Sequence, residues 1–335
     1  MKQIKTVPEL MEQMSEPSAE VKKLVSGIDG KILVLGAGGK MGPTLTQMLI
    51  RAGGKVIAVD LYPDEGVRKY LDDLGAETIQ CDLFDDEQLS RLPYSENVFL
   101  FVGTKFGATG NEPFVWSMNA FLPARIMGRY PKSRIVYLSS GNVYRFTDVN
   151  SAGATENDPV EPIGEYAMSR LGAERMVAYQ CQRNQSPTTI VRLFYATELR
   201  YGIVHDIAQK VYNDLVIDLS MGHVNQIWQG DACDYLIRCL EISDVPARTI
   251  NLTGEKVLTV RDIALKLGVL MKKQPRFDGH ESANALLGDS SVLYDRFGKP
   301  GVDEEQIISW VADWVMRGGE SLGKPTKYEK RDGKF

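Results

Sequence analysis

The glycine-rich stretch at residues 31–42 constrains the fold more than any other part of the chain. Four apolar residues at positions 32–35 predict a buried strand, Gly36, Gly39 and Gly42 follow, and a helical pattern comes next. Strand, glycine turn and helix in this order predict a cradle for a nucleotide phosphate, because glycines permit the tight turn and the close approach of the phosphate. The free N–H groups at the helix start then face the anion. Glycines also serve ordinary turns, so the rest of the chain decides the interpretation.

Composition bounds the class of protein. The chain has 335 residues, of which 43% are hydrophobic, and this suffices for a large α/β domain with a smaller lobe. The net charge of −5 argues against a nucleic-acid partner, and no apolar run approaches the ~18 residues of a membrane span. Four scattered cysteines and three histidines match no metal motif, so we expect no metal site. With no signal-peptide core at the N-terminus, these features predict a cytoplasmic protein with reduced thiols.

Strands and helices alternate from residue 31 to about residue 195. Apolar strands that alternate with helices predict an α/β protein with a doubly wound parallel sheet, covered on both faces. The expected strands cover residues 32–35, 55–60, 77–82, 97–102, 134–140 and 188–193. The two longest helices are expected at residues 113–130 and 165–182.

The chain divides into three parts by pattern. Residues 1–27 predict a helical extension, and residues 28–195 a nucleotide-binding domain. Residues 196–335 are expected to form mainly a smaller α/β substrate-binding lobe, interleaved with the sheet, with a strand near 215–219 and helices at 260–270 and 304–316. This lobe should lie over the carboxyl ends of the strands, where open α/β sheets bind ligands.

Carboxylates follow the second and third expected strands. Asp60 closes the second strand, and a carboxylate at that place accepts hydrogen bonds from ribose hydroxyls and repels a 2′-phosphate. NAD is therefore favoured over NADP. Asp82, followed by Leu83, closes the third strand, where it can accept the adenine amino group or cap the next helix.

A second polar group follows the strand expected at 134–140. Ser139 and Ser140 end this strand, and Tyr166 opens a helix in which Arg170 is one turn further on. A serine and a tyrosine above a nicotinamide ring can orient a substrate oxygen and exchange a proton with it while hydride moves. Because a phenol has an unperturbed pKa of about 10, it needs a neighbouring cation to act as a base at neutral pH.

Taken together, these motifs resemble the extended short-chain dehydrogenase/reductases, the NAD-dependent epimerase/dehydratase group, over about residues 28–318. The resemblance implies a Rossmann-type fold, bound NAD, Tyr166 as acid/base and Ser140 as the group that orients the substrate. It also implies carbohydrate-like substrates and a homodimer formed through the two long helices. The cofactor contacts that it implies are Gly36, Gly38, Gly39, Lys40, Met41, Gly42, Asp60, Leu61, Asp82, Leu83, Val102, Gly103, Thr104, Leu138, Ser139 and Tyr166.

The sequence departs from the family pattern at one position. The family motif is Tyr-x-x-x-Lys, whereas this chain has Arg170 in place of the lysine. Arginine keeps the charge but has a different shape and reach. Arg170 does the work of the lysine, or Lys105 reaches Tyr166 from the glycine-rich loop 103–110, or the chain binds NAD without turnover. The same loop is expected at the rim of the cofactor pocket, as a lid, a substrate loop or a plain connection.

Substrate contacts are expected from Asn142, Tyr144, Tyr195, Arg200 and Trp228. Arg200 can clamp a carboxylate or phosphate or pair with a nearby acid, and Trp228 can face a sugar ring or pack in the core. The main hypothesis is an NAD-dependent oxidoreductase or epimerase that acts on a hydroxyl or keto carbon of a sugar, sugar acid or nucleotide-sugar. The alternatives are a catalytically silent NAD-binding sensor and an NADP-linked reductase, against which Asp60 argues.

Overall fold

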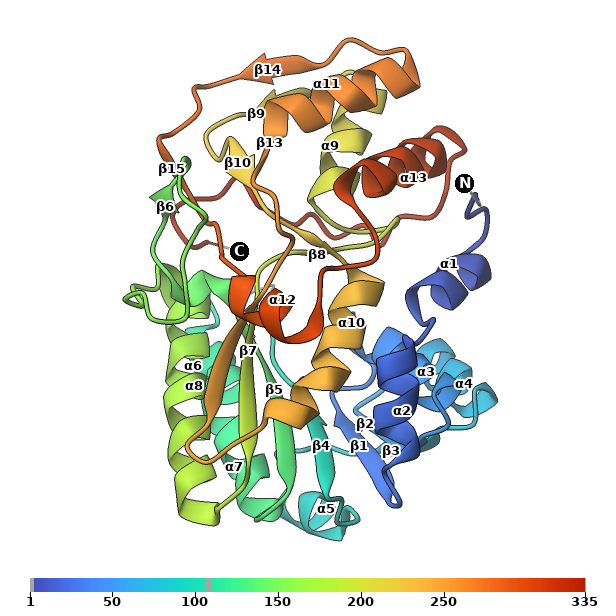
Figure 1. Cartoon of the computed structure of the whole chain (residues 1–335), viewed down its shortest axis with the longest axis vertical. Helices are drawn as coiled ribbons and strands as arrows, with labels where there is room; N and C mark the ends of the chain where they lie inside the picture. Colours follow the sequence, from blue (N-terminus) through green and yellow to red (C-terminus); the bar gives the residue numbers. More distant parts are fainter. Residues whose placement is uncertain (1–2, 106–109, 335) are drawn as a thin grey trace.

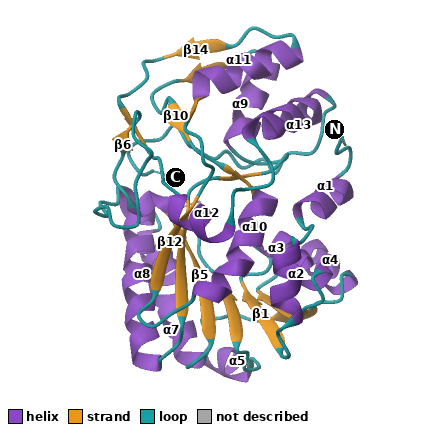
Figure 2. Cartoon of the chain, viewed as in Figure 1, coloured by secondary structure: helices purple, strands orange, loops and turns teal. Residues whose placement is uncertain are grey.

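The computed structural model, which describes residues 3–105 and 110–334, contains a seven-stranded parallel sheet with helices on both faces (Figure 1, Figure 2). The strand order is β12-β7-β5-β4-β1-β2-β3, and the order reverses beside β1. These strands are β1 Lys31–Leu35, β2 Lys55–Asp60, β3 Glu77–Gln80, β4 Asn97–Leu100, β5 Arg134–Ser140, β7 Thr188–Leu193 and β12 Arg248–Leu252. The predicted doubly wound α/β fold is confirmed, and its reversal point is where such sheets bind ligands.

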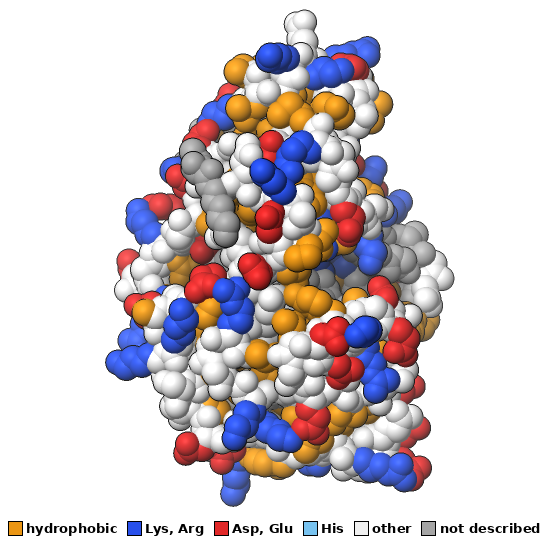
Figure 3. Space-filling model, turned by 90° about the vertical axis from the view of Figure 1, so that its right-hand side faces the viewer, with side chains coloured by type: hydrophobic (Ala, Val, Ile, Leu, Met, Phe, Trp, Pro, Cys, Tyr) orange, Lys and Arg blue, Asp and Glu red, His pale blue; other side chains and the backbone are white. Residues whose placement is uncertain are grey.

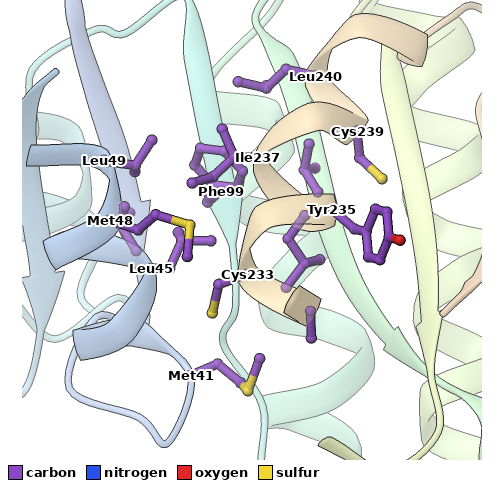
Figure 4. Packing of buried hydrophobic residues seen from close by; sticks show 14 of the residues in the cluster. Met41, Leu45, Met48, Leu49, Phe99, Cys233, Tyr235, Ile237, Cys239 and Leu240 are labelled. Carbon is purple, nitrogen blue, oxygen red and sulfur yellow. The ribbon is translucent and has the colours of Figure 1, made fainter. Parts of the chain in front are cut away.

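The apolar run of β1 supplies both faces of the sheet. Ile32 and Val34 belong to one hydrophobic core, while Leu33 and Leu35 belong to the core on the opposite face. A parallel strand covered on both sides needs such an uninterrupted run. The first core lies beneath α3 (Gly42–Arg51) and α10 (Gln229–Arg238), whose side chains meet around Phe99 of β4 (Figure 4).

The opposite face is covered by α5, α7 and α8. The continuous helix predicted at 113–130 is wrong in detail, because the segment consists of α6 (Glu112–Trp116), a π-helical turn (Ser117–Phe121) and α7 (Leu122–Arg129). Pro123 explains the interruption, since it has no N–H for the ordinary helical bond and its ring crowds the preceding turn. The other two helices are α5 (Asp86–Arg91) and α8 (Gly164–Asn184).

The predicted N-terminal helices are confirmed as α1 (Val7–Met14) and α2 (Ala19–Ser26). Thr6 and Glu9 form a capping box at α1, and the Ser18 hydroxyl accepts from the backbone N–H of Val21 at α2. Both helices contact α10, and α1 also contacts α3. The extension contacts two cores, because Val21 and Val25 of α2 belong to the core beneath α3 and α10, whereas Leu10 and Met14 of α1 belong to the core of the C-terminal lobe.

The upper lobe in Figure 1 is built by α9 (Ile203–Tyr212), α11 (Val260–Met271) and α13 (Glu304–Met316) around a separate hydrophobic core. The predicted strand near 215–219 is β9 (Val216–Asp218), which pairs with β14 (Arg276–Asp278). The remaining elements are α4 Glu65–Asp73, α12 Ser291–Phe297, and the paired short strands β6 Thr147–Asp148 with β15 Asn284–Ala285, β8 Ala196–Thr197 with β11 Ile227–Trp228, and β10 His223–Val224 with β13 Leu258–Thr259.

Two elements of the C-terminal half return to the sheet. The helix α10 covers one face, and β12 pairs with β7 as an edge strand. The pattern of residues 248–252 did not indicate a strand of the main sheet, because polar Arg248, Thr249 and Asn251 interrupt the apolar run. We therefore keep as a proposal the division of the chain at residue 195 into a nucleotide-binding domain and a smaller lobe. Parts of the C-terminal half are interleaved with the sheet.

Three further observations on the described residues concern membrane-spanning helices, metal ligands and surface charge. None of their helices is long and apolar enough to cross a membrane. Within this same part of the chain, no three His, Cys, Asp or Glu side chains gather as metal ligands, and the four cysteines are buried and unpaired. On the face shown in Figure 3, acidic and basic side chains are interspersed.

Candidate active site

The loop between β1 and α3 has the geometry of a phosphate cradle. Gly36 has φ +87°, and a Cβ atom there would lie 2.9 Å from the backbone carbonyl carbon of Phe101. A Cβ atom on Gly42 would lie 2.2 Å from the carbonyl oxygen of Ala37, so only glycine fits. The N-cap residue of α3, Met41, makes no side-chain cap bond, but the expected free N–H groups are fewer than predicted, because the N–H of Gly42 donates to the carbonyl of Gly39 at 3.2 Å and Pro43 has none. This cradle fits the pyrophosphate of a dinucleotide.

Two cavities meet at this loop. One has a volume of about 710 Å³ and extends to α1 and the residues after β2, and the other has a volume of about 270 Å³ and extends to the end of β5 and the start of α8. Both are lined by Gly39, Lys40, Gly103, Thr104, Lys105 and Tyr201. We call them the adenosine cavity and the nicotinamide cavity, because together they offer a continuous path for a dinucleotide across the reversal point of the sheet.

The predicted adenosine contacts lie beside this path. Asp60 accepts hydrogen bonds from the backbone N–H groups of Gly38 at 3.0 Å and Tyr62 at 3.3 Å, so its carboxylate sits against the glycine loop. The carboxylate of Asp82 accepts from the N–H of Phe84 at 2.9 Å and thereby shapes the turn before α5. Asp60, Leu61, Asp82 and Leu83 do not line the adenosine cavity, whose outer wall is formed by Val7, Met11, Pro63, Asp64, Gly66, Val67, Tyr70, Leu322 and Lys324.

Ser140 and Tyr166 line the same nicotinamide cavity, as the sequence predicted. Ser140 ends β5, and its hydroxyl donates to Oδ1 of Asn142 at 3.0 Å and accepts from the Asn142 N–H at 3.2 Å. Tyr166 is in the first turn of α8. Asn142 and Tyr195, two of the predicted substrate contacts, line this cavity too. The end of β5 and the start of α8 therefore bring the side chains of Ser140, Asn142 and Tyr166 to the same cavity as Tyr195.

A buried network supports the end of β5. The hydroxyl of Ser139 donates to Glu174 at 2.6 Å, and Arg192 of β7 forms an ion pair with Glu174 at 2.7 Å. Arg192 also donates to the hydroxyl of Tyr144 at 2.5 Å, and this hydroxyl donates to Asn251 at 2.9 Å. Because the phenol of Tyr144 is already engaged there, its ring rather than its hydroxyl faces a small side cavity.

Arg170 lines the nicotinamide cavity, and backbone carbonyls hold its guanidinium. Its guanidinium donates to Leu138 at the end of β5 and to Val102 after β4, the latter at 3.4 Å, and it stacks over the ring of Tyr137. A Cβ atom on Gly103 would lie 2.5 Å from Nη1 of Arg170, so the glycine makes room for the larger cation. Gly103 thus leaves space for the arginine that replaces the family lysine. Arg170 links the end of β5 to the chain after β4.

Lys105 approaches Tyr166 from the other side. Its Nζ atom lies 5.9 Å from the centre of the Tyr166 ring and 3.4 Å from the carbonyl oxygen of Thr326. Burial and the nearby charge of Lys327 lower the pKa of Lys105 to about 8, while Asp206 acts in the opposite direction. The sequence predicted a lid, a substrate loop or a plain connection at residues 103–110, and residues 106–109 of this loop lie outside the described residues.

Asn119, in the π-helical turn, fixes the base of the loop that carries Lys105. Its side chain accepts from the N–H of Thr104 at 2.7 Å and donates to the Thr104 carbonyl and the Ser169 hydroxyl, each at 2.9 Å. Ser169 belongs to α8, the helix of Tyr166. The break in the predicted long helix therefore couples the loop to the catalytic helix.

Lys40 occupies the junction of the two cavities. Its Nζ atom donates to the carbonyl of Ala196 at 2.7 Å and lies 4.1 Å from the ring centre of Tyr201. Burial lowers the pKa of Lys40 to about 8, although Glu198 opposes the shift. A cation at this point of the path is placed to neutralise a pyrophosphate.

Two predicted substrate contacts lie elsewhere. Trp228 is 1% exposed and packs against Trp310 in the core of the upper lobe, so it lines neither large cavity. Arg200 lines the adenosine cavity and pairs with Glu198 at 3.2 Å. The nicotinamide cavity also contains Thr326 from the C-terminal segment, which no local pattern in the sequence indicated.

Comparisons with known proteins agree with this geometry. Residues 32–197 match the model of the NAD dependent epimerase/dehydratase family. A 2-alkyl-3-oxoalkanoate reductase of Shewanella oneidensis is 29% identical over 161 residues, a match that covers 47% of this chain and 40% of that relative. The chain thus spans less than half the length of this relative.

Solved structures show the same fold. The UDP-glucuronic acid 4-epimerase from Bacillus cereus in complex with NAD superposes with a TM-score of 0.73 at 17% identity, over 88% of this chain and 99% of that chain. A UDP-galactose 4-epimerase superposes with a TM-score of 0.69 at 21% identity, over 86% of this chain and 99% of that chain. Residues 32–197 therefore carry the NAD dependent epimerase/dehydratase domain, which confirms the resemblance seen in the sequence and the choice of NAD.

Proposed function

We propose that the protein is an NAD-dependent oxidoreductase or epimerase that acts on a hydroxyl or keto carbon of a carbohydrate-like substrate. The observation that carries the proposal is the convergence of Ser140, Tyr166 and Lys105 on a cavity that continues into the glycine cradle. Bound NAD would supply the chemistry of accepting and returning hydride. The chain itself has to hold the cofactor, orient the substrate oxygen and move its proton.

Tyr166 moves the proton in this proposal. Its phenol takes a proton from the substrate hydroxyl during oxidation or gives one to the carbonyl oxygen during reduction. Ser140 donates to the same oxygen and holds it in place. The Nζ atom of Lys105 lies 5.9 Å from the centre of the Tyr166 ring and would stabilise negative charge that develops there during proton transfer, while Arg170 remains bound to backbone carbonyls. Lys105 rather than Arg170 thus takes over the electrostatic role of the family lysine.

Replacement of the phenol tests the role of Tyr166. Tyr166→Phe should lower kcat on the order of 100-fold or more, because the acid/base group is lost. NAD affinity should change little, since the ring remains in the cavity. Tyr179→Phe is the matched control, because Tyr179 is on the same helix and 58% exposed. Unchanged substrate-dependent NADH absorbance in Tyr166→Phe contradicts the assignment.

A catalytically silent NAD-binding protein is the second candidate. It is favoured by Arg170, which replaces the family lysine in the lining of the nicotinamide cavity and donates to strand-end carbonyls. Purified protein with bound NAD distinguishes the two functions. Reduction of the cofactor by any polyol, sugar or sugar acid, or conversion of any of them to a product, excludes the silent protein, whereas neither reduction nor product across a broad panel at full NAD occupancy supports it.

We also propose a homodimer in the cytoplasm. Large apolar side chains are exposed along α6, the π-helical turn and α8, with Phe121 57%, Tyr179 58% and Met176 43% exposed. Such a face suits burial against a second copy. Light scattering should give twice the mass of the chain, and Phe121→Asp should shift the protein towards the monomer. A monomer at all concentrations for the unmodified chain contradicts the proposal.

A further inference from the structure

The C-terminal segment, residues 318–334, returns from α13 into the cleft between the lobe and the sheet, where the chain ends (Figure 1). Leu322 donates its N–H to the carbonyl of Arg200 at 3.1 Å. Thr326 donates its N–H and its hydroxyl to the carboxylate of Asp206 at 2.7 and 2.6 Å. Tyr328 is 1% exposed in the core of the lobe. The first half of the segment is therefore fixed to α9.

The second half of the segment crosses to the catalytic helix. Arg331 donates to the carbonyl of Ser220 at 3.2 Å and to that of Asn284 at 3.0 Å, and it lies over the ring of Phe146. Gly333 then packs against Gly164, where a Cβ atom would lie 2.6 Å from the carbonyl oxygen of Gly333. Gly164 is the first residue of α8, two positions before Tyr166. The segment thus bridges the substrate lobe and the helix that carries the proposed acid/base.

The space that this bridge leaves is small. Beyond Asn142 and Tyr195, away from the cofactor path, the cleft contains a side cavity of about 20 Å³, closed by Lys330, Arg331 and Gly333. A cavity of roughly 10–15 Å³ is the minimum for one water molecule, so this one has room for little more. The nicotinamide cavity has about 270 Å³, and sites for drug-sized ligands occupy about 300–1,000 Å³. The two cavities together leave room for little beyond a nicotinamide ring and a sugar ring.

We propose that the substrate is a nucleotide-free molecule of monosaccharide size, and that the C-terminal segment excludes nucleotide-linked sugars. This inference rests on the proposed function of the nicotinamide cavity. It separates this chain from the two epimerases of similar fold, which are named for UDP-linked sugars. The polar groups beside Tyr166, namely Ser140, Asn142 and Lys105, would then bind the hydroxyl or carboxylate groups of a small substrate directly.

Binding of UDP to the full chain loaded with NAD tests the exclusion without depending on turnover. Calorimetry with UDP, UDP-glucose and UDP-glucuronate should detect no binding at millimolar concentration. In a parallel panel, every compound that reduces the bound NAD should lack a nucleotide. Binding of UDP or turnover of a UDP-sugar by the unmodified chain overturns the inference, even if Tyr166→Phe behaves as proposed.

A variant of the segment tests which residues exclude the nucleotide. Lys330→Ala combined with Arg331→Ala removes two walls of the side cavity, and UDP affinity should rise by at least about tenfold, which corresponds to ~1.4 kcal/mol. Lys334→Ala is the matched control, because Lys334 is exposed and lines none of the three cavities. A double variant that folds and still binds no UDP overturns the role of the segment. Loss of all redox activity with intact UDP exclusion counts against the proposed function alone.

Discussion

The glycine loop and the C-terminal segment both line the central cleft, but they are held in place in different ways. The loop spans residues 36–42, and its shape depends on contacts between its own members, such as Ala37 with Gly42, and on the neighbouring strand ends at Asp60 and Phe101. The C-terminal segment has little regular structure, and its position depends on Arg200, Asp206 and Gly164, which are far away in the sequence. Related chains that have the same glycines can form the same loop. The position of the C-terminal segment depends on the lobe against which it packs.

This difference separates binding of the cofactor from selection of the substrate. The cradle needs only glycines and a helix start, which bind any pyrophosphate. In our proposal, the substrate side is lined by segments from distant parts of the chain, namely the end of β5, residues 193–196 and 201–202, the start of α8 and the C-terminal segment. Changes on the substrate side can therefore alter specificity while NAD binding is retained.

The largest effect is expected in the cradle. Gly42→Ala forces a Cβ atom to within 2.2 Å of the Ala37 carbonyl oxygen, so the loop has to open, and NAD affinity should fall on the order of 100-fold. Fluorescence titration with NAD measures the loss, and circular dichroism checks the fold. Gly30→Ala is the control, because nothing lies within 4 Å of its Cβ position. Equal affinities of the two variants would show that the loop is not the cofactor cradle.

The next effect distinguishes the two cations near Tyr166. Lys105→Met should lower kcat by roughly 10- to 100-fold, because the cation beside the Tyr166 ring is lost. Arg170→Met should instead lower the free energy of unfolding by about 1–3 kcal/mol, since two buried carbonyls lose their donor. Kinetics and urea unfolding separate these outcomes. A reversed pattern would return the family role to Arg170.

A smaller effect is expected in the pH dependence of NAD binding. Burial lowers the pKa of Lys40 to about 8, so between pH 8 and the unfolded value of about 10.4 the unfolded chain binds more protons, and the stability of the ligand-free protein rises with pH. The pyrophosphate favours the charged lysine. NAD affinity should thus fall by about tenfold from pH 7 to pH 10. Calorimetry in two buffers of different ionisation enthalpy should detect proton uptake, and Lys40→Gln should remove most of it.

The smallest effect is expected in the C-terminal segment. Thr326→Ala removes one of two hydrogen bonds to Asp206 and should lower stability by about 1 kcal/mol, with a rise of KM of a few fold. Thr326→Ser keeps the hydroxyl and should restore both values. A KM that is unchanged in Thr326→Ala, with the expected loss of stability, would show that the segment does not border the substrate.

Much of the nucleotide-binding half was predictable because its determinants are close in the sequence. The apolar run of β1, the three glycines and the Tyr166 motif each act within one element. The π-helical turn was missed although Pro123 was visible, because a proline permits several helix distortions and only the contacts of Asn119 select one. The edge strand β12 was missed because its polar residues are used in tertiary contacts, such as the bond between Asn251 and Tyr144.

The sequence by itself determined the sheet, the cradle, the cofactor and the family, because strand periodicity and glycine spacing are visible within single stretches of the chain. Only the tertiary structure decided which groups Arg170 and Lys105 contact. It places Arg170 on the carbonyls of Val102 and Leu138, and it brings Lys105 to Tyr166. It also decided the size of the substrate cavity, which depends on a C-terminal segment whose contacts are made across more than a hundred residues of chain.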